Sequence, residues 1–125
     1  MMARIAAVAA GGAIGSVLRY LLSLGVHGIL GRGFPWGTLA VNVLGCFAMG
    51  ALFVLFLDRF ENNTVLRAGI LIGVLGGFTT FSSFSIETFN LIEEGAHLKA
   101  LANMAANLLL CVAATWGGVM IGRNL

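Results

Sequence analysis

Four long apolar stretches, separated by short polar connectors, form the dominant pattern of this 125-residue chain. A helix needs about 20 apolar residues to cross the hydrocarbon core of a membrane. By that measure the stretches predict transmembrane helices over residues 5–26, 37–57, 65–91 and 98–121. The connectors hold half of the charged residues and the only proline. The pattern therefore predicts one all-α integral membrane domain covering residues 1–125.

Composition excludes a soluble enzyme. Charged residues make up 10% of the chain and hydrophobic residues 59%, whereas about a quarter of a soluble domain is charged. The net charge of +2 is too small to indicate binding to nucleic acid. No nucleophile–base pair, metal-ligand cluster or phosphate-binding loop is evident, so no catalytic residues are predicted.

The cysteines and histidines carry little signal. Cys46 and Cys111 lie in apolar runs, and we interpret them as small packing residues rather than a disulfide or a metal site. His27 and His97 fall in the predicted connectors, and we interpret them as solvated loop residues rather than ligands or proton carriers.

The distribution of cations barely favours one membrane orientation. With four spans, both termini share a side with the second connector. That side carries four arginines: Arg4, Arg59, Arg67 and Arg123. The other side carries two cations, Arg32 and Lys99. Lys/Arg bias sets orientation, so a chain this weakly biased can insert both ways and form an antiparallel homodimer. A single orientation set by the small excess is the alternative.

Glycines recur at four-residue spacing and suggest close helix packing. The chain has 18 glycines, and small residues at this spacing let helix backbones approach in lipid. The spaced sets are Gly11 and Gly15, Gly69, Gly73 and Gly77, and Gly118 and Gly122. Four helices enclose almost no interior, so we expect an oligomer. Alternatively, the glycines reflect only their general abundance in membrane helices.

The third apolar stretch is expected to break within the membrane. Residues 65–75 form a clean apolar half-helix that is too short to cross the bilayer. Two glycines and a run of Thr, Ser and Phe follow, and these residues are poor helix formers. We predict a break near Gly76 to Thr80, with released carbonyls suited to a small cation. An unbroken Ser/Thr-rich helix is the alternative.

Aromatic and hydroxyl residues follow the predicted break. Phe81 and Phe84 share a helix face, and Ser82 and Ser85 share a neighbouring face. The electropositive ring edges and the hydroxyl donors could replace part of an anion's hydration shell. Weak binding at several positions permits conduction. The alternative is that the phenylalanines face lipid or the core.

Other polar residues lie inside the apolar stretches. Asn42 must find partners there. Residues 103, 107, 111 and 115 form a polar stripe that could line a water-filled route or join helices. Arg19 should reach an interface, an aqueous vestibule or a partner. Glu87 is expected near a pore mouth.

The segment from Gly76 to Ser85 resembles the Fluc fluoride-channel family of microbial membranes. Three further matches to that family support the resemblance, which covers essentially the whole chain: Gly11 to Gly15 leading to Arg19-Tyr20, Gly37-Thr38 followed by Val41-Asn42, and Glu87 after the serines. Ser83 stands where threonine is common in the family, and this change keeps the hydroxyl group.

The resemblance implies a passive channel that exports fluoride and relieves its toxicity. It implies an antiparallel, dual-topology homodimer with two pores in the microbial cell (inner) membrane, in contact with lipid. Phe81, Phe84, Asn42, Ser82, Ser85 and Thr115 would form the fluoride pathway. The main-chain carbonyls of Gly76 and Thr79 would hold a structural sodium ion at the dimer centre. Arg19 and Glu87 would be structural or vestibule residues.

Two other functions are considered. A small multidrug exporter also has four helices in an antiparallel dimer, but it needs an embedded carboxylate in its first helix, and this helix has none. A purely structural membrane protein would explain the glycines. It would leave the predicted break and the buried polar residues without a role.

Overall fold

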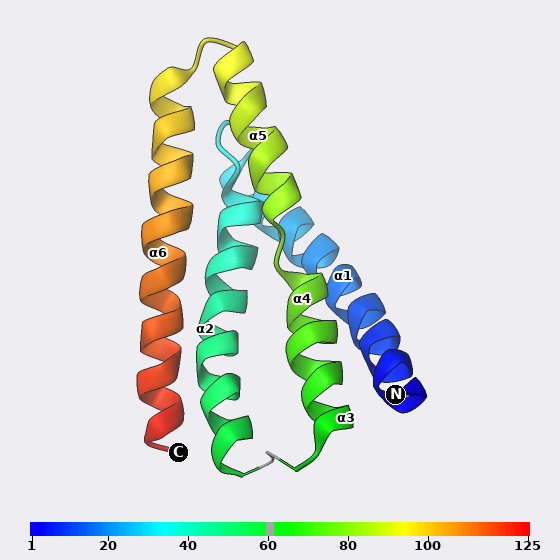
Figure 1. The fold of residues 1–125 in the computed structure, drawn as a ribbon. Helices are drawn as coiled ribbons and strands as arrows, with labels where there is room; N and C mark the ends of the chain where they lie inside the picture. Colours follow the sequence, from blue (N-terminus) through cyan, green and yellow to red (C-terminus); the bar gives the residue numbers. More distant parts are fainter. Residues whose placement is uncertain (60–61) are drawn as a thin grey trace.

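The computed structural model describes residues 1–59 and 62–125, and these residues form helices joined by short connectors. The elements in chain order are α1 (Met2–Leu30), α2 (Trp36–Asp58), α3 (Thr64–Arg67), the π-helix η1 (Ala68–Val74), α4 (Leu75–Phe78), α5 (Phe81–Glu93) and α6 (His97–Arg123). Figure 1 shows them as a bundle in which α3, η1, α4 and α5 together make the third span.

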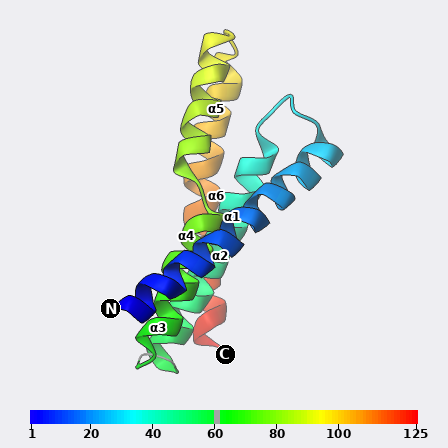
Figure 2. The ribbon, with the colours of Figure 1, turned by 90° about the vertical axis from the view of Figure 1, so that its right-hand side faces the viewer.

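The described residues contain four segments that are long and apolar enough to cross a membrane: Met2–Leu30, Trp36–Asp58, Thr64–Glu93 and His97–Arg123. Both chain termini lie toward the same end of the bundle as the end of α2 and the start of α3 (Figure 1). The predicted four-span, all-α class is therefore confirmed. Turning the molecule shows that α1 crosses the other spans obliquely (Figure 2).

The helices extend a few residues beyond their predicted ends, and the first span shows the clearest difference. α1 continues to Leu30, so the placement of His27 in a connector is wrong. His27 lies in the last turn of α1, where its Nε2 accepts a hydrogen bond of 3.2 Å from the amide of Gly37. The imidazole therefore joins the end of α1 to the start of α2.

The third span is interrupted, as the sequence predicts. Between α4 and α5, Thr79 and Thr80 adopt extended backbone conformations. The half before the break is not regular either, because Ala68–Val74 forms a π-helix. The amide of Leu75 donates to the carbonyl of Ile70, five residues earlier. π-helical segments frequently occur at functional sites, and the sequence did not predict this one.

Glycines set the close packing of helix pairs, as their spacing predicts. α1 packs on the first half of the third span, and an added methyl group at Gly15 would lie 2.1 Å from the carbonyl oxygen of Val74. α2 and α6 form the most extensive pair, and a methyl group at Gly118 would meet the carbonyl oxygen of Phe47 at the same distance. The spaced glycines therefore join helices within one chain.

The buried core of the chain is small. Phe56, Leu71 and Leu75 form its centre, where α2 meets the first half of the third span. Large apolar side chains are exposed along all four spans. Such surface suits lipid or another protein rather than water.

Candidate functional site

The break in the third span begins where helical hydrogen bonding stops. Thr79 still donates its amide to the carbonyl of Leu75, but its ψ of 155° turns the chain out of the helix. Thr80 then caps α5, because its Oγ1 accepts a 3.2 Å hydrogen bond from the amide of Ser83. Threonine is a favoured N-cap residue. The two threonines therefore end one helix and start the next.

Asn42 on α2 replaces the helical partners that Thr80 loses. The Thr80 amide donates to Asn42 Oδ1 at 2.8 Å, and Asn42 Nδ2 donates to the Thr80 carbonyl at 3.0 Å. This two-way pairing satisfies exposed backbone at membrane depth, where an unpaired polar group is costly. The partners that Asn42 needs are thus backbone groups of the break.

A chain of hydrogen bonds continues from Asn42 through α6 to α5. Asn42 Nδ2 also donates to Asn107 Oδ1 at 3.3 Å, and Asn107 donates to Asn103. Asn103, 1% exposed, donates to Thr88 Oγ1 at 2.8 Å, and Thr88 donates to the Phe84 carbonyl. Of the two roles predicted for the polar stripe of α6, Asn103 and Asn107 therefore have that of joining helices.

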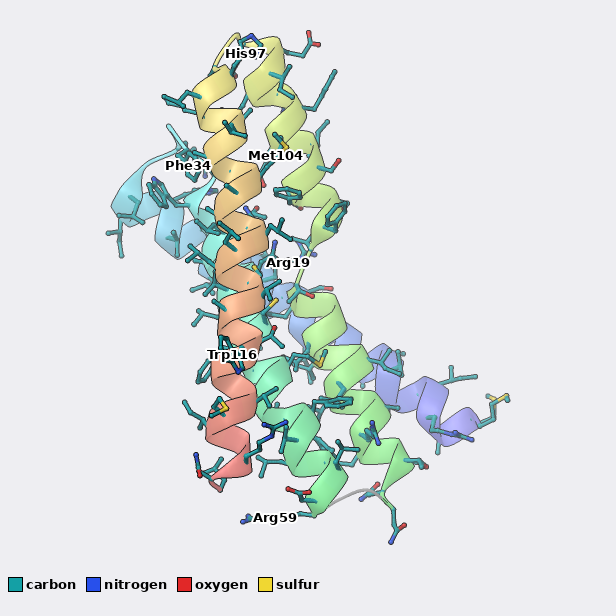
Figure 3. The ribbon with its side chains drawn as sticks, turned by 60° about the vertical axis from the view of Figure 1, so that its left-hand side comes forward. Arg19, Phe34, Arg59, His97, Met104 and Trp116 are labelled. Carbon is teal, nitrogen blue, oxygen red and sulfur yellow. The ribbon has the colours of Figure 1, made fainter. Side chains whose placement is uncertain are left out.

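Arg19 stabilises the end of the half-helix before the break. Its Nε donates to the carbonyl of Gly77 at 3.2 Å. In a continuous helix this carbonyl would accept from the amide four residues later. A cation at a helix C-terminus also interacts favourably with the helix dipole. Figure 3 shows Arg19 at the level of the break.

Two carbonyls at the break lose their helical donors. The Thr80 amide, which would donate to the Gly76 carbonyl, donates to Asn42. The Ser83 amide, which would donate to the Thr79 carbonyl, donates to the Thr80 hydroxyl. Hard oxygen atoms of unwound backbone are ligands that Na⁺ prefers. The carbonyls of Gly76 and Thr79 fit the sodium site that the resemblance implies.

A cavity of about 500 Å³ lies beside the break, between α2, α5 and α6. Asn42, Thr79 and Thr80 line one side of it, and the phenylalanines line another. The side that α6 contributes holds Met104, Asn107, Leu108, Cys111 and Val112. The wall is mostly apolar, with a few polar groups concentrated at the break.

Phe81 and Phe84 lie together at the edge of this cavity. Their ring centroids are 5.3 Å apart and their planes are inclined by 54°. Phe81 is 77% exposed, whereas Phe84 is half-buried. Because the planes are tilted, the edge of one ring, rather than its face, points toward the other ring. The two rings do share one face of α5, as their spacing predicts.

The other predicted pathway residues lie elsewhere in the single chain. Ser82 and Ser85 are exposed on α5, where the Ser82 hydroxyl lies 3.3 Å from that of Thr80. Thr115 lies lower on α6, where its backbone packs against Gly50 of α2. Among the described residues, none of these three lines the cavity beside the break.

Glu87 lies on α5 beside a second pocket, of about 370 Å³, near the connectors at one end of the bundle. Cationic and histidine side chains share this pocket: His27, Arg32 and Lys99. Glu87 Oε1 is buried without a hydrogen-bond partner among the described residues. Its placement at the end of the bundle is compatible with a vestibule.

Sequence reasoning missed the roles of Thr80, Thr88 and Asn107. Thr80 belonged to the predicted break but not to the predicted site, and its hydroxyl cap explains where α5 begins. Asn107 stood in the polar stripe, and only the structure shows that it contacts Asn42. The sequence feature that could have indicated Thr80 and Asn107 is a polar residue within an apolar run.

Comparison with known proteins agrees with this geometry. Residues 6–119 match the family model described as CrcB-like protein, Camphor Resistance (CrcB). A protein of Magnetococcus marinus is 54% identical over 120 residues, covering 96% of this chain and 98% of its own. A Geobacter sulfurreducens protein is 50% identical over 99% of this chain and 100% of its own, and an Agrobacterium fabrum protein is 47% identical over 99% of both.

Each of these three relatives bears the name fluoride-specific ion channel FluC. The family is one of membrane channels rather than enzymes, and the match to its model, over residues 6–119, reaches all four apolar spans of this chain. The chain is thus a multi-pass protein of a microbial cell membrane. By its sequence match and its four apolar spans, it belongs to the CrcB-like family.

Proposed function

We propose that this chain is a passive, fluoride-selective channel that exports fluoride and relieves its toxicity. The observation that carries the proposal is the interrupted third span, where Asn42, Phe81 and Phe84 meet around one cavity. The names of the relatives, fluoride-specific ion channel FluC, support the choice of ion.

The chemistry of the cavity suits a small, strongly hydrated anion. Hydrogen atoms on the edges of the Phe81 and Phe84 rings carry partial positive charge, and Asn42, whose amide donates to Thr80 and Asn107, lines another side of the same cavity. Conduction requires binding that is favourable but weak enough for release. No cationic side chain lines the cavity among the described residues, so an anion is not held by a full positive charge there.

We infer that two copies assemble, in antiparallel orientation, to complete two pores. In one chain Phe81 is 77% exposed and the break is only half-buried. Irregular backbone at membrane depth needs cover from protein or water, and a second copy would supply it. The exposed Ser82 and Ser85 would then face the partner or the pathway, and Thr115 would extend the polar track.

We propose that a sodium ion at the dimer centre uses the Gly76 and Thr79 carbonyls. Two carbonyls per chain would give four oxygen ligands across a two-fold axis. The support is the loss of the helical donors to both carbonyls. If so, the fraction of dimer in detergent should rise with Na⁺ concentration and fall when N-methylglucamine replaces Na⁺. Equal dimer fractions in the two cations would contradict the proposed sodium site.

The decisive experiment is fluoride efflux from liposomes that contain the purified protein. Wild type should release fluoride rapidly and passively, with little chloride flux. Phe81→Ile and Asn42→Ala should reduce the rate severely. Phe89→Ile is the matched control, because Phe89 lies on α5 and does not line the cavity.

Three outcomes would contradict the proposed channel. Chloride flux equal to fluoride flux would contradict the proposed selectivity for fluoride. Undiminished efflux in both cavity variants would place the pathway elsewhere. Dependence of fluoride movement on a proton gradient would indicate a coupled transporter.

A further inference from the structure

The two cysteines of the chain occupy one wall of the cavity beside the break. Cys46 comes from α2 and Cys111 from α6, and both line that cavity. Both cysteines are free, and the contacts on either side of them, Asn42 with Asn107 and Gly50 with Thr115, bring them to the same level of the two helices. We propose that Cys46 and Cys111 form a two-coordinate site for one soft monovalent cation, Cu(I) or Ag(I).

The register of α2 on α6 holds the pair in place. Asn42 contacts Asn107 at a separation of 65 residues. Two helical turns further, Gly50 meets the Thr115 backbone, so the turn between these contacts places Cys46 opposite Cys111. All three pairs have the same separation along the chain. The thiol pairing is therefore one step of a regular helix contact rather than an accident of one rotamer.

The two helices approach closely one turn below the thiols. A methyl group at Gly50 would lie 2.2 Å from the carbonyl oxygen of Thr115, so no side chain separates the backbones one turn below the thiols. The Asn42–Asn107 hydrogen bond of 3.3 Å fixes the turn above. The thiols are thus held from both sides and need little rearrangement to share an ion.

Two thiols suit a soft cation better than any other ion. Thiolate ligands favour Cu(I), zinc and iron–sulfur clusters, but structural zinc and these clusters usually take four protein ligands. Ag(I) shares the charge and softness of Cu(I). The described residues contain no group of three or more His, Cys, Asp or Glu side chains that could bind a metal with more ligands. A site of two sulfur ligands therefore favours ions that accept two ligands.

Charge balance also favours a monovalent ion. Metal binding at thiols releases protons. When one thiol loses its proton to water and the second sulfur coordinates as a thiol, one M⁺ replaces one H⁺. The net charge of the site is then unchanged, which matters because the surrounding wall is apolar.

Binding is tested first, because it does not depend on the proposed function. Reduced protein in detergent is titrated anaerobically with Cu(I) in competition with a chromophoric Cu(I) chelator. Wild type should bind one Cu(I) per chain. Cys46→Ser and Cys111→Ser should each weaken binding by more than roughly 100-fold, since even outer-shell partners of a metal contribute 10- to 100-fold.

Met104→Leu is the matched control, because it removes the other sulfur atom of the cavity wall. It lies two turns from Cys111 on α6 and should leave Cu(I) binding unchanged. Thermal unfolding of each variant verifies that the fold is retained. Binding by either serine variant at wild-type affinity, or no binding by reduced wild type, would overturn the site.

The second measurement rests on the proposed function. Ag(I) added to liposomes in nitrate buffer should stop fluoride efflux by wild type, and added thiol should restore it. Any fluoride efflux by Cys46→Ser, compared with the rate of the same variant without Ag(I), should be insensitive to Ag(I). If wild type binds Cu(I) but does not conduct fluoride, the proposed channel function is wrong and the metal site stands. If Ag(I) still blocks efflux in both serine variants, the metal site is wrong.

Discussion

Asn42 shows how one side chain can support an interrupted helix. It gives the Thr80 amide an acceptor and the Thr80 carbonyl a donor, and it also contacts Asn107. A buried polar group without a partner costs about 1–3 kcal/mol. Placing one amide side chain opposite the break avoids two such penalties. The same residue then has its remaining hydrogen directed toward α6.

The buried pair of Asn103 and Thr88 allows a measurement of this network. A double-mutant cycle with Asn103→Ala and Thr88→Val should give a coupling free energy of about 0.6–1.7 kcal/mol, the range for hydrogen bonds between membrane helices. Unfolding in mixed micelles with added SDS provides the free energies. A cycle of Asn103→Ala with Asn90→Ala, two residues from Thr88 on α5, should give a coupling near zero.

At the scale of elements, α5 depends on the threonine that begins it. Thr80→Val keeps the size of the side chain but removes the oxygen that accepts from the Ser83 amide. Loss of an N-cap costs about 0.5–2 kcal/mol. Amide hydrogen exchange measured by mass spectrometry should therefore become faster in the first turn of α5. Thr64→Val, in α3, should leave exchange in α5 unchanged, and unchanged exchange in Thr80→Val would argue against the cap.

The α2–α6 pair depends on glycine at one position and not at its neighbour. Gly118→Ala would place a methyl group 2.1 Å from the Phe47 carbonyl oxygen, whereas a methyl group at Gly117 would lie no closer than 4.0 Å to any such neighbour. Overpacking of this kind costs about 1–3 kcal/mol. Thermal unfolding in detergent should show a lower midpoint for Gly118→Ala and an unchanged one for Gly117→Ala. Equal midpoints would mean that the helices can separate without cost.

The sequence predicted the spans and the break because both depend on local composition. Apolar runs fix the helices, and Gly76-Gly77 followed by Thr79-Thr80 marks where regular structure ends. The π-helix over Ala68–Val74 carries no such mark, since its apolar residues and its two glycines are like those of the other spans. Its irregularity accompanies close packing on α1, which is a tertiary effect.

The candidate site was harder to predict because its contacts join residues far apart in the sequence. Asn42 meets Thr80 across 38 residues and Asn107 across 65. That register depends on how closely glycines let α2 approach α6. For the same reason the spacing could not show that the Thr115 backbone packs on Gly50 and that Thr115 is not among the residues lining the cavity.

At the scale of the whole molecule, dual topology can be tested with a single label. Asn124→Cys, in a chain with Cys46→Ser and Cys111→Ser, places a thiol at an exposed terminus. If the weak charge bias allows both orientations, a membrane-impermeant maleimide should label about half of the chains in intact cells and all of them after lysis. Labelling of all or none in intact cells would indicate one orientation.

The order of the helices along the chain has a consequence for biosynthesis. α5 packs on α6, and Thr88 accepts its hydrogen bond from Asn103. A ribosome makes α5 before α6, so the nascent third span enters the bilayer without the helix that covers it. Until the last span follows, Asn42 also lacks Asn107. The insertion machinery must therefore shelter a polar interruption that the finished chain later covers only in part with α6.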